Sequence, residues 1–188
     1  MKNISIIDID AGNLYNVHKA FKFIGANVEI TKDSKLIEKS DAVVFPGVGA
    51  FGAVMDSIRK NNLEDVIIKS AKSQKPFLGI CLGMQVLFEG SEENPKEKGL
   101  NVFKGQVVKF KKAKKIPHVG WNDVAGKKYY FVHSYYACPE DKSIIASSTD
   151  YDGEIFTSVI KKDNLLAVQF HPEKSGDAGL ELLRDFLP

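Results

Sequence analysis

The chain has 188 residues, a formal net charge of +2, and 44% hydrophobic and 27% charged residues. This length predicts a single domain over residues 1–188, with a core that needs neither disulfides nor metals. The small net charge argues against nucleic acid as a partner, and no apolar run is long enough to cross a membrane. With two cysteines, scattered histidines and no signal peptide, we expect a cytoplasmic protein without a metal or cofactor.

Up to residue 99, apolar strands alternate with amphipathic helices. We expect strands at 4–9, 27–31, 42–45 and 77–80, and helices at 13–24, 50–59 and 63–71. This βαβα order predicts a parallel sheet with helices on both faces, which is a three-layer α/β sandwich. Ligands of such sheets bind at the carboxyl ends of the strands.

The rest of the chain is richer in short strands. We expect an exposed loop at 90–99, strands at 102–110, 129–133, 144–148, 155–160 and 165–170, and a helix at 178–186. The central sheet is therefore mostly parallel, with an added β-rich C-terminal half. Six lysines gather in this half, and we interpret them as a solvated strand edge, although they could face a polyanion or a phosphorylated ligand. They are Lys104, Lys109, Lys111, Lys112, Lys114 and Lys115.

The segment Gly79-Ile80-Cys81-Leu82-Gly83 has the pattern of a nucleophile elbow. An apolar strand precedes it and an apparent helix to about residue 89 follows, so Cys81 would lie at a sharp strand-to-helix turn. Glycines suit such a turn because its backbone is strained and closely packed. A thiol at a helix N-terminus also favours the thiolate. The alternative is a buried structural cysteine.

A cysteine nucleophile needs a base and a group that orients the base. His171-Pro172-Glu173 follows an apolar strand at once, and strand alternation would project both polar side chains to the same side. We expect His171 to act as base and acid, and Glu173 to hold its tautomer. Taken alone, this tripeptide is better explained as a turn that carries a surface histidine; its place at the carboxyl end of a strand, on the same sheet edge as Cys81, favours the catalytic pair.

Attack on a carbonyl also needs N–H donors for the oxyanion. Elbow geometry assigns one donor to the backbone of Leu82. The second donor is expected from Val48 or Gly49 in Pro46-Gly47-Val48-Gly49, which ends the third strand and could flip a peptide when ligand binds. A plain strand-to-helix turn is the alternative for this segment.

In this order, the oxyanion segment, the elbow and the His-Pro-Glu segment resemble the class I glutamine amidotransferases. That resemblance spans nearly the whole chain and implies their fold and the hydrolysis of glutamine through a cysteinyl thioester. It also implies that Gly47, Gln85, Ser134 and Tyr135 bind the substrate glutamine. Cys138 has no base near it in the sequence, and we expect a core residue there.

Further segments are similar to the glutaminase subunits of imidazole glycerol phosphate synthases. They include Pro117-His118-Val119-Gly120-Trp121-Asn122 and Tyr151-Asp152-Gly153-Glu154. The resemblance implies a TIM-barrel cyclase partner that receives ammonia in a heterodimer, for histidine and purine-precursor (AICAR) synthesis. The positions that match the partner-facing residues are Asn13, Asn16, Trp121, Tyr130 and Lys174.

Two alternatives remain open at this point. Ile9 and Asp10 depart from the residues frequent in that family, and both lie beside the expected partner face. A class I amidotransferase that serves a different synthase, for example in surface-sugar amidation, could therefore keep every motif. A catalytically silent binding module has no chemical need for a cysteine, a histidine and a glutamate at matching positions.

Overall fold

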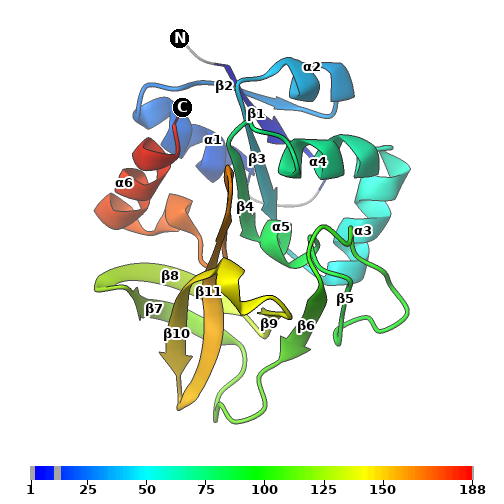
Figure 1. Cartoon of the computed structure of the whole chain (residues 1–188). Helices are drawn as coiled ribbons and strands as arrows, with labels where there is room; N and C mark the ends of the chain where they lie inside the picture. Colours follow the sequence, from blue (N-terminus) through cyan, green and yellow to red (C-terminus); the bar gives the residue numbers. More distant parts are fainter. Residues whose placement is uncertain (1–2, 11–13, 188) are drawn as a thin grey trace.

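A seven-stranded sheet runs through the molecule in the computed structural model, which describes residues 3–10 and 14–187 (Figure 1). Its order is β10-β11-β12-β4-β3-β1-β2. Neighbours from β12 to β2 are parallel, whereas β10 and β11 join one edge antiparallel. The strands are β1 (Asn3–Ile7), β2 (Asn27–Thr31), β3 (Ala42–Gly47), β4 (Phe77–Cys81), β10 (Ile145–Tyr151), β11 (Glu154–Lys162) and β12 (Leu165–Val168).

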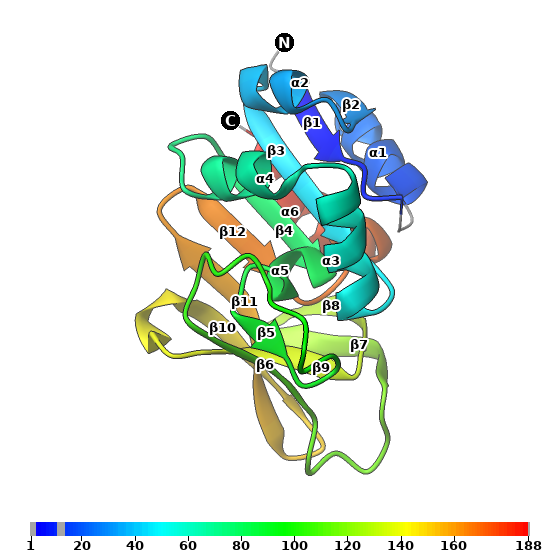
Figure 2. The same ribbon diagram turned by 90° about the vertical axis from the view of Figure 1, so that its right-hand side faces the viewer.

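Helices cover both faces of this sheet (Figure 2). One face carries α1 (Leu14–Phe23) and α6 (Gly176–Phe186), and the other carries α3 (Phe51–Lys60) and α4 (Glu64–Ala71). The short α2 (Ser34–Lys39) packs beside α4. The expected three layers and mostly parallel sheet are confirmed, because βαβ crossovers place helices on both sides.

Smaller β-elements lie beyond one end of the sheet (Figure 1). A three-stranded sheet joins β5 (Gly90–Ser91), β6 (Gly105–Lys109) and β9 (Tyr135–Pro139), and a ribbon joins β7 (His118–Val124) to β8 (Lys127–His133). Two 3₁₀ turns, η1 (Lys142–Ile144) and η2 (Pro172–Lys174), complete the elements of the described residues. The sequence pattern did not predict α2, β5, β7 or β9.

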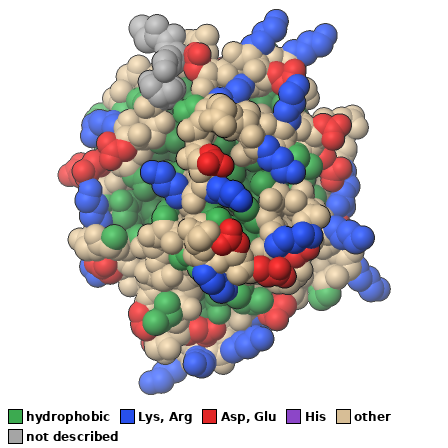
Figure 3. Space-filling view, viewed as in Figure 1, with side chains coloured by type: hydrophobic (Ala, Val, Ile, Leu, Met, Phe, Trp, Pro, Cys, Tyr) green, Lys and Arg blue, Asp and Glu red, His purple; other side chains and the backbone are tan. Residues whose placement is uncertain are grey.

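Four of the six lysines lie in a loop that follows β6, whereas Lys104 precedes β6 and Lys109 is its last residue. β6 is the central strand of its sheet, and the following residues 110–117 are held by the β10–β11 hairpin. Glu154 accepts hydrogen bonds from the N–H groups of Lys111 and Lys112, and Asp152 accepts one from Lys114. Acidic and basic side chains are interspersed on the face in Figure 3.

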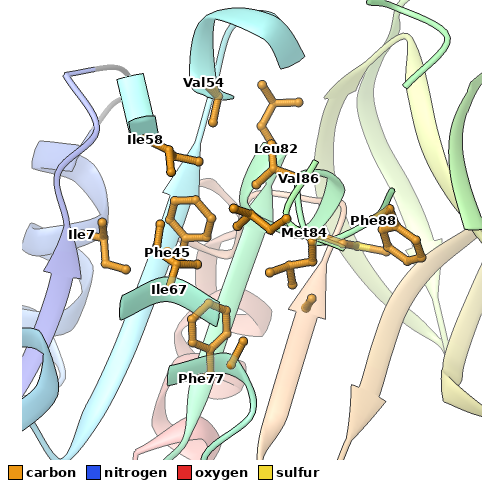
Figure 4. Packing of buried hydrophobic residues seen from close by; sticks show 14 of the residues in the cluster. Ile7, Phe45, Val54, Ile58, Ile67, Phe77, Leu82, Met84, Val86 and Phe88 are labelled. Carbon is orange, nitrogen blue, oxygen red and sulfur yellow. The ribbon is translucent and has the colours of Figure 1, made fainter. Parts of the chain in front are cut away.

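Buried apolar side chains fill the space between the sheet and its helices. On the α3–α4 face, Phe45 and Phe77 of the sheet point toward Val54, Ile58 and Ile67 of the helices (Figure 4). Apart from their last residues, β3 and β4 are apolar along their length. These central strands need apolar residues on both sides because both of their faces are buried. No helix of the described residues is long and apolar enough to cross a membrane.

Three local expectations were wrong. The helix after the elbow, α5 (Leu82–Gln85), ends at Gln85 instead of continuing to about residue 89. The loop 90–99 contains β5, whose two residues are buried. Cys138 is exposed and is not a core residue, because its side chain lies on the outer face of β9.

Candidate active site

Cys81 lies at a strained turn between β4 and α5. Its backbone has φ 56° and ψ −111°, a conformation that L-residues rarely adopt, and the residue is 5% exposed. The turn is closely packed, because a Cβ on Gly83 would overlap the carbonyl oxygen of Phe45 in β3. Glycine at position 83 therefore lets α5 approach the sheet and holds the thiol at the carboxyl end of the strand.

His171 and Glu173 form a buried pair next to the end of β12, which is the parallel neighbour of β4. The Nδ1 atom of His171 lies 2.8 Å from Oε1 of Glu173, and the two side chains are 2% and 3% exposed. A turn of 3₁₀ helix, η2, brings them together, so the expected extended geometry was wrong. The carbonyl of Tyr130 accepts a hydrogen bond from the backbone N–H of His171, which ties the histidine to β8.

The electrostatics of His171 suit a base that becomes a cation. Burial opposes a charge on the ring, but the interactions with Cys81 and Glu173 outweigh burial and raise the pKa of His171 to about 10. Among the described residues, no partner lies within ordinary hydrogen-bond distance of Nε2. That nitrogen is therefore free to exchange a proton with the thiol or with a bound ligand.

A cavity of about 260 Å³ opens over the thiol. It joins Cys81 and His171 to nearly all of the expected oxyanion and substrate residues. Its lining is Val48, Gly49, Cys81, Leu82, Gln85, Glu93, Pro117, Val132, His133, Ser134, Tyr135 and His171. Leu82 is the first residue of α5, so its N–H has no intrahelical partner. Gly49 has φ 104°, a left-handed conformation that favours glycine.

Gly47 does not line this cavity. It pairs with Cys81 across β3 and β4, and an added Cβ would lie 2.9 Å from the N atom of Gly83 and from Cβ of Leu82. Gly47 therefore serves the close packing of α5 on β3. Among the residues of the expected substrate set, Gln85, Ser134 and Tyr135 do line the cavity.

The structure adds Glu93 and Gln169 to the site. Oε2 of Glu93 accepts a hydrogen bond of 2.7 Å from the N–H of Phe51, which places a carboxylate in the cavity wall at the start of α3. Gln169 is fully buried, and its Nε2 lies 3.7 Å from Sγ of Cys81. Sequence reasoning missed both, since Glu93 lies in the segment expected to be an exposed loop and Gln169 reads as part of an apolar strand.

The expected partner-facing residues that the structure describes gather on one side of the site. Trp121 is 57% exposed, its ring centroid lies 6.2 Å from that of Tyr130, and Nζ of Lys174 lies 5.8 Å from the Tyr130 centroid. Asn16 and Lys174 line a groove of about 810 Å³ that also includes Glu173. The expectation for Asn13 lies outside the described residues. No group of three or more possible metal ligands occurs among the described residues.

Comparisons with known proteins agree on one family. The glutamine amidotransferase class-I family model matches residues 5–188. A Pyrococcus furiosus protein named imidazole glycerol phosphate synthase subunit HisH is 50% identical, over 99% of this chain and 98% of its own length. A Thermococcus kodakarensis protein of the same name is 46% identical, over 97% and 98%.

Solved structures agree with the fold. One described as a glutamine amidotransferase has a TM-score of 0.79 and 18% identity, over 98% of this chain and 96% of that chain. The PurLQS structure from Thermotoga maritima has a TM-score of 0.77 and 17% identity, over 99% and 98%. Similarity at this level of identity supports the architecture alone.

Proposed function

Because this chain belongs to the class I glutamine amidotransferases, and within them to the HisH subunits of imidazole glycerol phosphate synthase, we propose that it hydrolyses glutamine to supply ammonia to a synthase. One observation carries the chemistry. Cys81 on its strained turn and His171 with an unpartnered Nε2 line the same cavity, and Glu173 lies behind His171 at 2.8 Å from its Nδ1. This is the arrangement of nucleophile, base and orienting carboxylate that acyl transfer requires.

The reaction divides into two acyl transfers. The thiolate of Cys81 adds to the carboxamide carbon, and the resulting oxyanion takes hydrogen bonds from Leu82 and from the segment Val48–Gly49. The intermediate collapses, His171 gives its proton to the departing nitrogen, and ammonia leaves behind a glutamyl thioester. His171, now neutral, takes a proton from water, which attacks the thioester and releases glutamate. The thiolate and the imidazolium are restored.

The cavity wall accounts for recognition of the amino acid. Glu93 is the carboxylate among the lining residues, so it is the partner of the α-ammonium group of glutamine. Gln85 donates both of its amide hydrogens to protein acceptors, and its Oε1 accepts no hydrogen bond from the described residues. That oxygen is available to the substrate, together with backbone groups of Ser134 and Tyr135.

The ammonia is proposed to pass to a barrel-type cyclase subunit. Trp121, Tyr130 and Lys174 form an exposed aromatic and cationic group on the side of the triad, which suits the anchor of an interface. Glu173 belongs both to the catalytic pair and to the adjoining groove. A docked partner would therefore exclude water near the site and keep ammonia from being protonated. The two free cysteines suit a reducing cytoplasm.

Glutamate and ammonia release from glutamine tests the assignment. Cys81→Ala is expected to abolish the activity, and Cys138→Ala is the matched control because that cysteine is exposed and does not line the cavity. Iodoacetamide should inactivate the native enzyme and the Cys138→Ala variant alike. Full activity in Cys81→Ala would overturn the assignment of the nucleophile.

The partner is tested by mixing the chain with the barrel cyclase of its own organism. We expect a one-to-one complex and faster glutaminase turnover, because we expect the isolated chain to be weakly active and its segment 47–49 to reorient on assembly. Hydrogen exchange that does not change there would contradict the switch. A complex with a different synthase, without binding to the cyclase, would support the second function, in which ammonia goes to another acceptor.

A further inference from the structure

A continuous chain of hydrogen bonds leads inward from the exposed β7–β8 ribbon. Nδ2 of Asn122 lies 3.4 Å from Nε2 of His118, and Nδ1 of His118 lies 3.0 Å from Nε2 of His133. Nδ1 of His133 lies 2.9 Å from the carbonyl oxygen of Tyr135. Asn122 follows Trp121 in β7, and its side chain lies on the opposite face of the strand, in phase with His118.

The same carbonyl connects the chain to the nucleophile. Nε2 of Gln85 donates to the carbonyl of Tyr135 and to Oε1 of Gln169, each at 2.9 Å. Nε2 of Gln169 then points at Sγ of Cys81. Two donors occupy the two lone pairs of the Tyr135 carbonyl, so its direction is fixed. The residues at these points, Tyr135, Gln85 and Cys81, all line the cavity.

The acceptors at each end assign the tautomers. The carbonyl of Tyr135 can only accept, so His133 carries its proton on Nδ1 and presents a lone pair at Nε2. His118 must then donate from Nδ1 and accept at Nε2. Asn122 cannot reverse its amide without losing the 2.8 Å bond from Nδ2 to the carbonyl of Asp150. One arrangement of hydrogens therefore satisfies the chain.

Burial keeps both rings neutral. It lowers the pKa of His118 to about 4, partly offset by Asp152. It lowers the pKa of His133 to about 3 against the opposing hydrogen bond to Tyr135, with smaller contributions from His118 and His171 in the same direction as burial. His118 is stacked on Tyr151 with centroids 3.9 Å apart. Neither ring can change tautomer by gaining a proton near neutral pH.

We propose that His118 and His133 are positioning residues of the glutaminase, which hold the Tyr135 carbonyl and, through it, the side-chain amides of Gln85 and Gln169. The inference rests on the proposed hydrolysis of glutamine. Neither histidine is expected to touch the reacting atoms. Their role is to keep Oε1 of Gln85 turned to the substrate and the N–H of Gln169 turned to the sulfur.

Two substitutions of His118 separate hydrogen bonding from packing. His118→Phe keeps an aromatic ring against Tyr151 but removes the donor to His133, which can then move its proton to Nε2 and repel the carbonyl. We expect the KM for glutamine to rise about tenfold, which is the effect of one lost hydrogen bond, with kcat changed by less than about threefold. His118→Asn retains a donor at the Nδ1 position and should restore most of the native KM.

An unchanged KM in His118→Phe would overturn the inference, and so would a folded His118→Asn variant that is as impaired as His118→Phe. Long-range ¹H–¹⁵N spectra of the histidine-labelled native chain give an independent readout. They should show protons on Nδ1 of both rings, and the opposite tautomer on either ring would overturn the inference even if glutaminase activity is intact. A native chain that does not hydrolyse glutamine but shows these tautomers would instead count against the proposed function.

Discussion

Replacement of Glu173 by glutamine removes the charge behind His171 with little change in shape. The carboxylate accepts the Nδ1 proton at 2.8 Å, and both side chains are almost fully buried. In the variant, the amide can turn its NH₂ group toward Nδ1, which forces the ring proton onto Nε2. That nitrogen then faces Cys81 as a donor and cannot act as the base.

The expected loss follows from this single contact. A buried hydrogen bond to a charged group contributes about 1.5–3 kcal/mol. If the bond acts mainly in the transition state, where the ring is cationic, kcat falls about ten- to hundredfold. The KM for glutamine should change little, because Glu173 is not among the residues that line the cavity.

The assay is glutamate release under saturating glutamine, together with the pH dependence of Cys81 alkylation by iodoacetamide in a Cys138→Ser background. Glu173 helps to raise the pKa of His171, so its loss lowers that pKa and leaves the thiolate without its counter-charge. The alkylation profile should therefore move to higher pH in the variant. An unchanged kcat with an unmoved alkylation profile would refute the orienting role.

Three further predictions concern stability and assembly. Gly83→Ala should destabilise the chain by about 3 kcal/mol in chemical denaturation, because its Cβ overlaps the Phe45 carbonyl; an unchanged midpoint would contradict this packing. Burial raises the pKa of Glu154, but hydrogen bonds from backbone N–H groups and a tyrosine outweigh it and leave the pKa lowered. Its contribution is thus present above the unfolded carboxyl pKa of about 4.3 and is lost as the pH falls through the folded value. Glu154→Gln should cost about 2 kcal/mol at pH 7 and progressively less below pH ~4; a cost that does not vary with pH would be inconsistent with a charge effect. Trp121→Ala should weaken cyclase binding by about 2 kcal/mol in titration calorimetry, whereas Leu36→Ala, at a partly exposed site on α2, should not; equal effects would argue against the proposed face.

Two of the elements that sequence reasoning missed, β7 and α2, lack a clear apolar period. The burial of β7 alternates, but its inward positions carry His118, Gly120 and Asn122 before Val124, so the inward face is not marked by apolar side chains. α2 has six residues and buries one of them, Ile37, which is too short for a helical period. Neither element therefore leaves a recognisable apolar pattern in the sequence.

The elbow could be predicted because its requirements are local. A strained turn against a neighbouring strand needs glycine at particular offsets from the nucleophile, so Gly79, Cys81 and Gly83 mark it within five consecutive positions. The His171 and Glu173 pair is equally local, although the structure joins its members by a 3₁₀ turn and not by an extended strand.

The sequence alone thus determined the parallel architecture, the candidate nucleophile and the candidate base. Tertiary structure alone decided what surrounds them: Gln169 beside the thiol, Glu93 in the cavity wall, and the two neutral histidines behind Tyr135. Gln85 and Gln169 are 84 positions apart and meet only because β12 pairs with β4. Local sequence records what a turn or a strand requires of its own backbone. Contacts between distant segments arise from packing and strand register, which no short segment specifies.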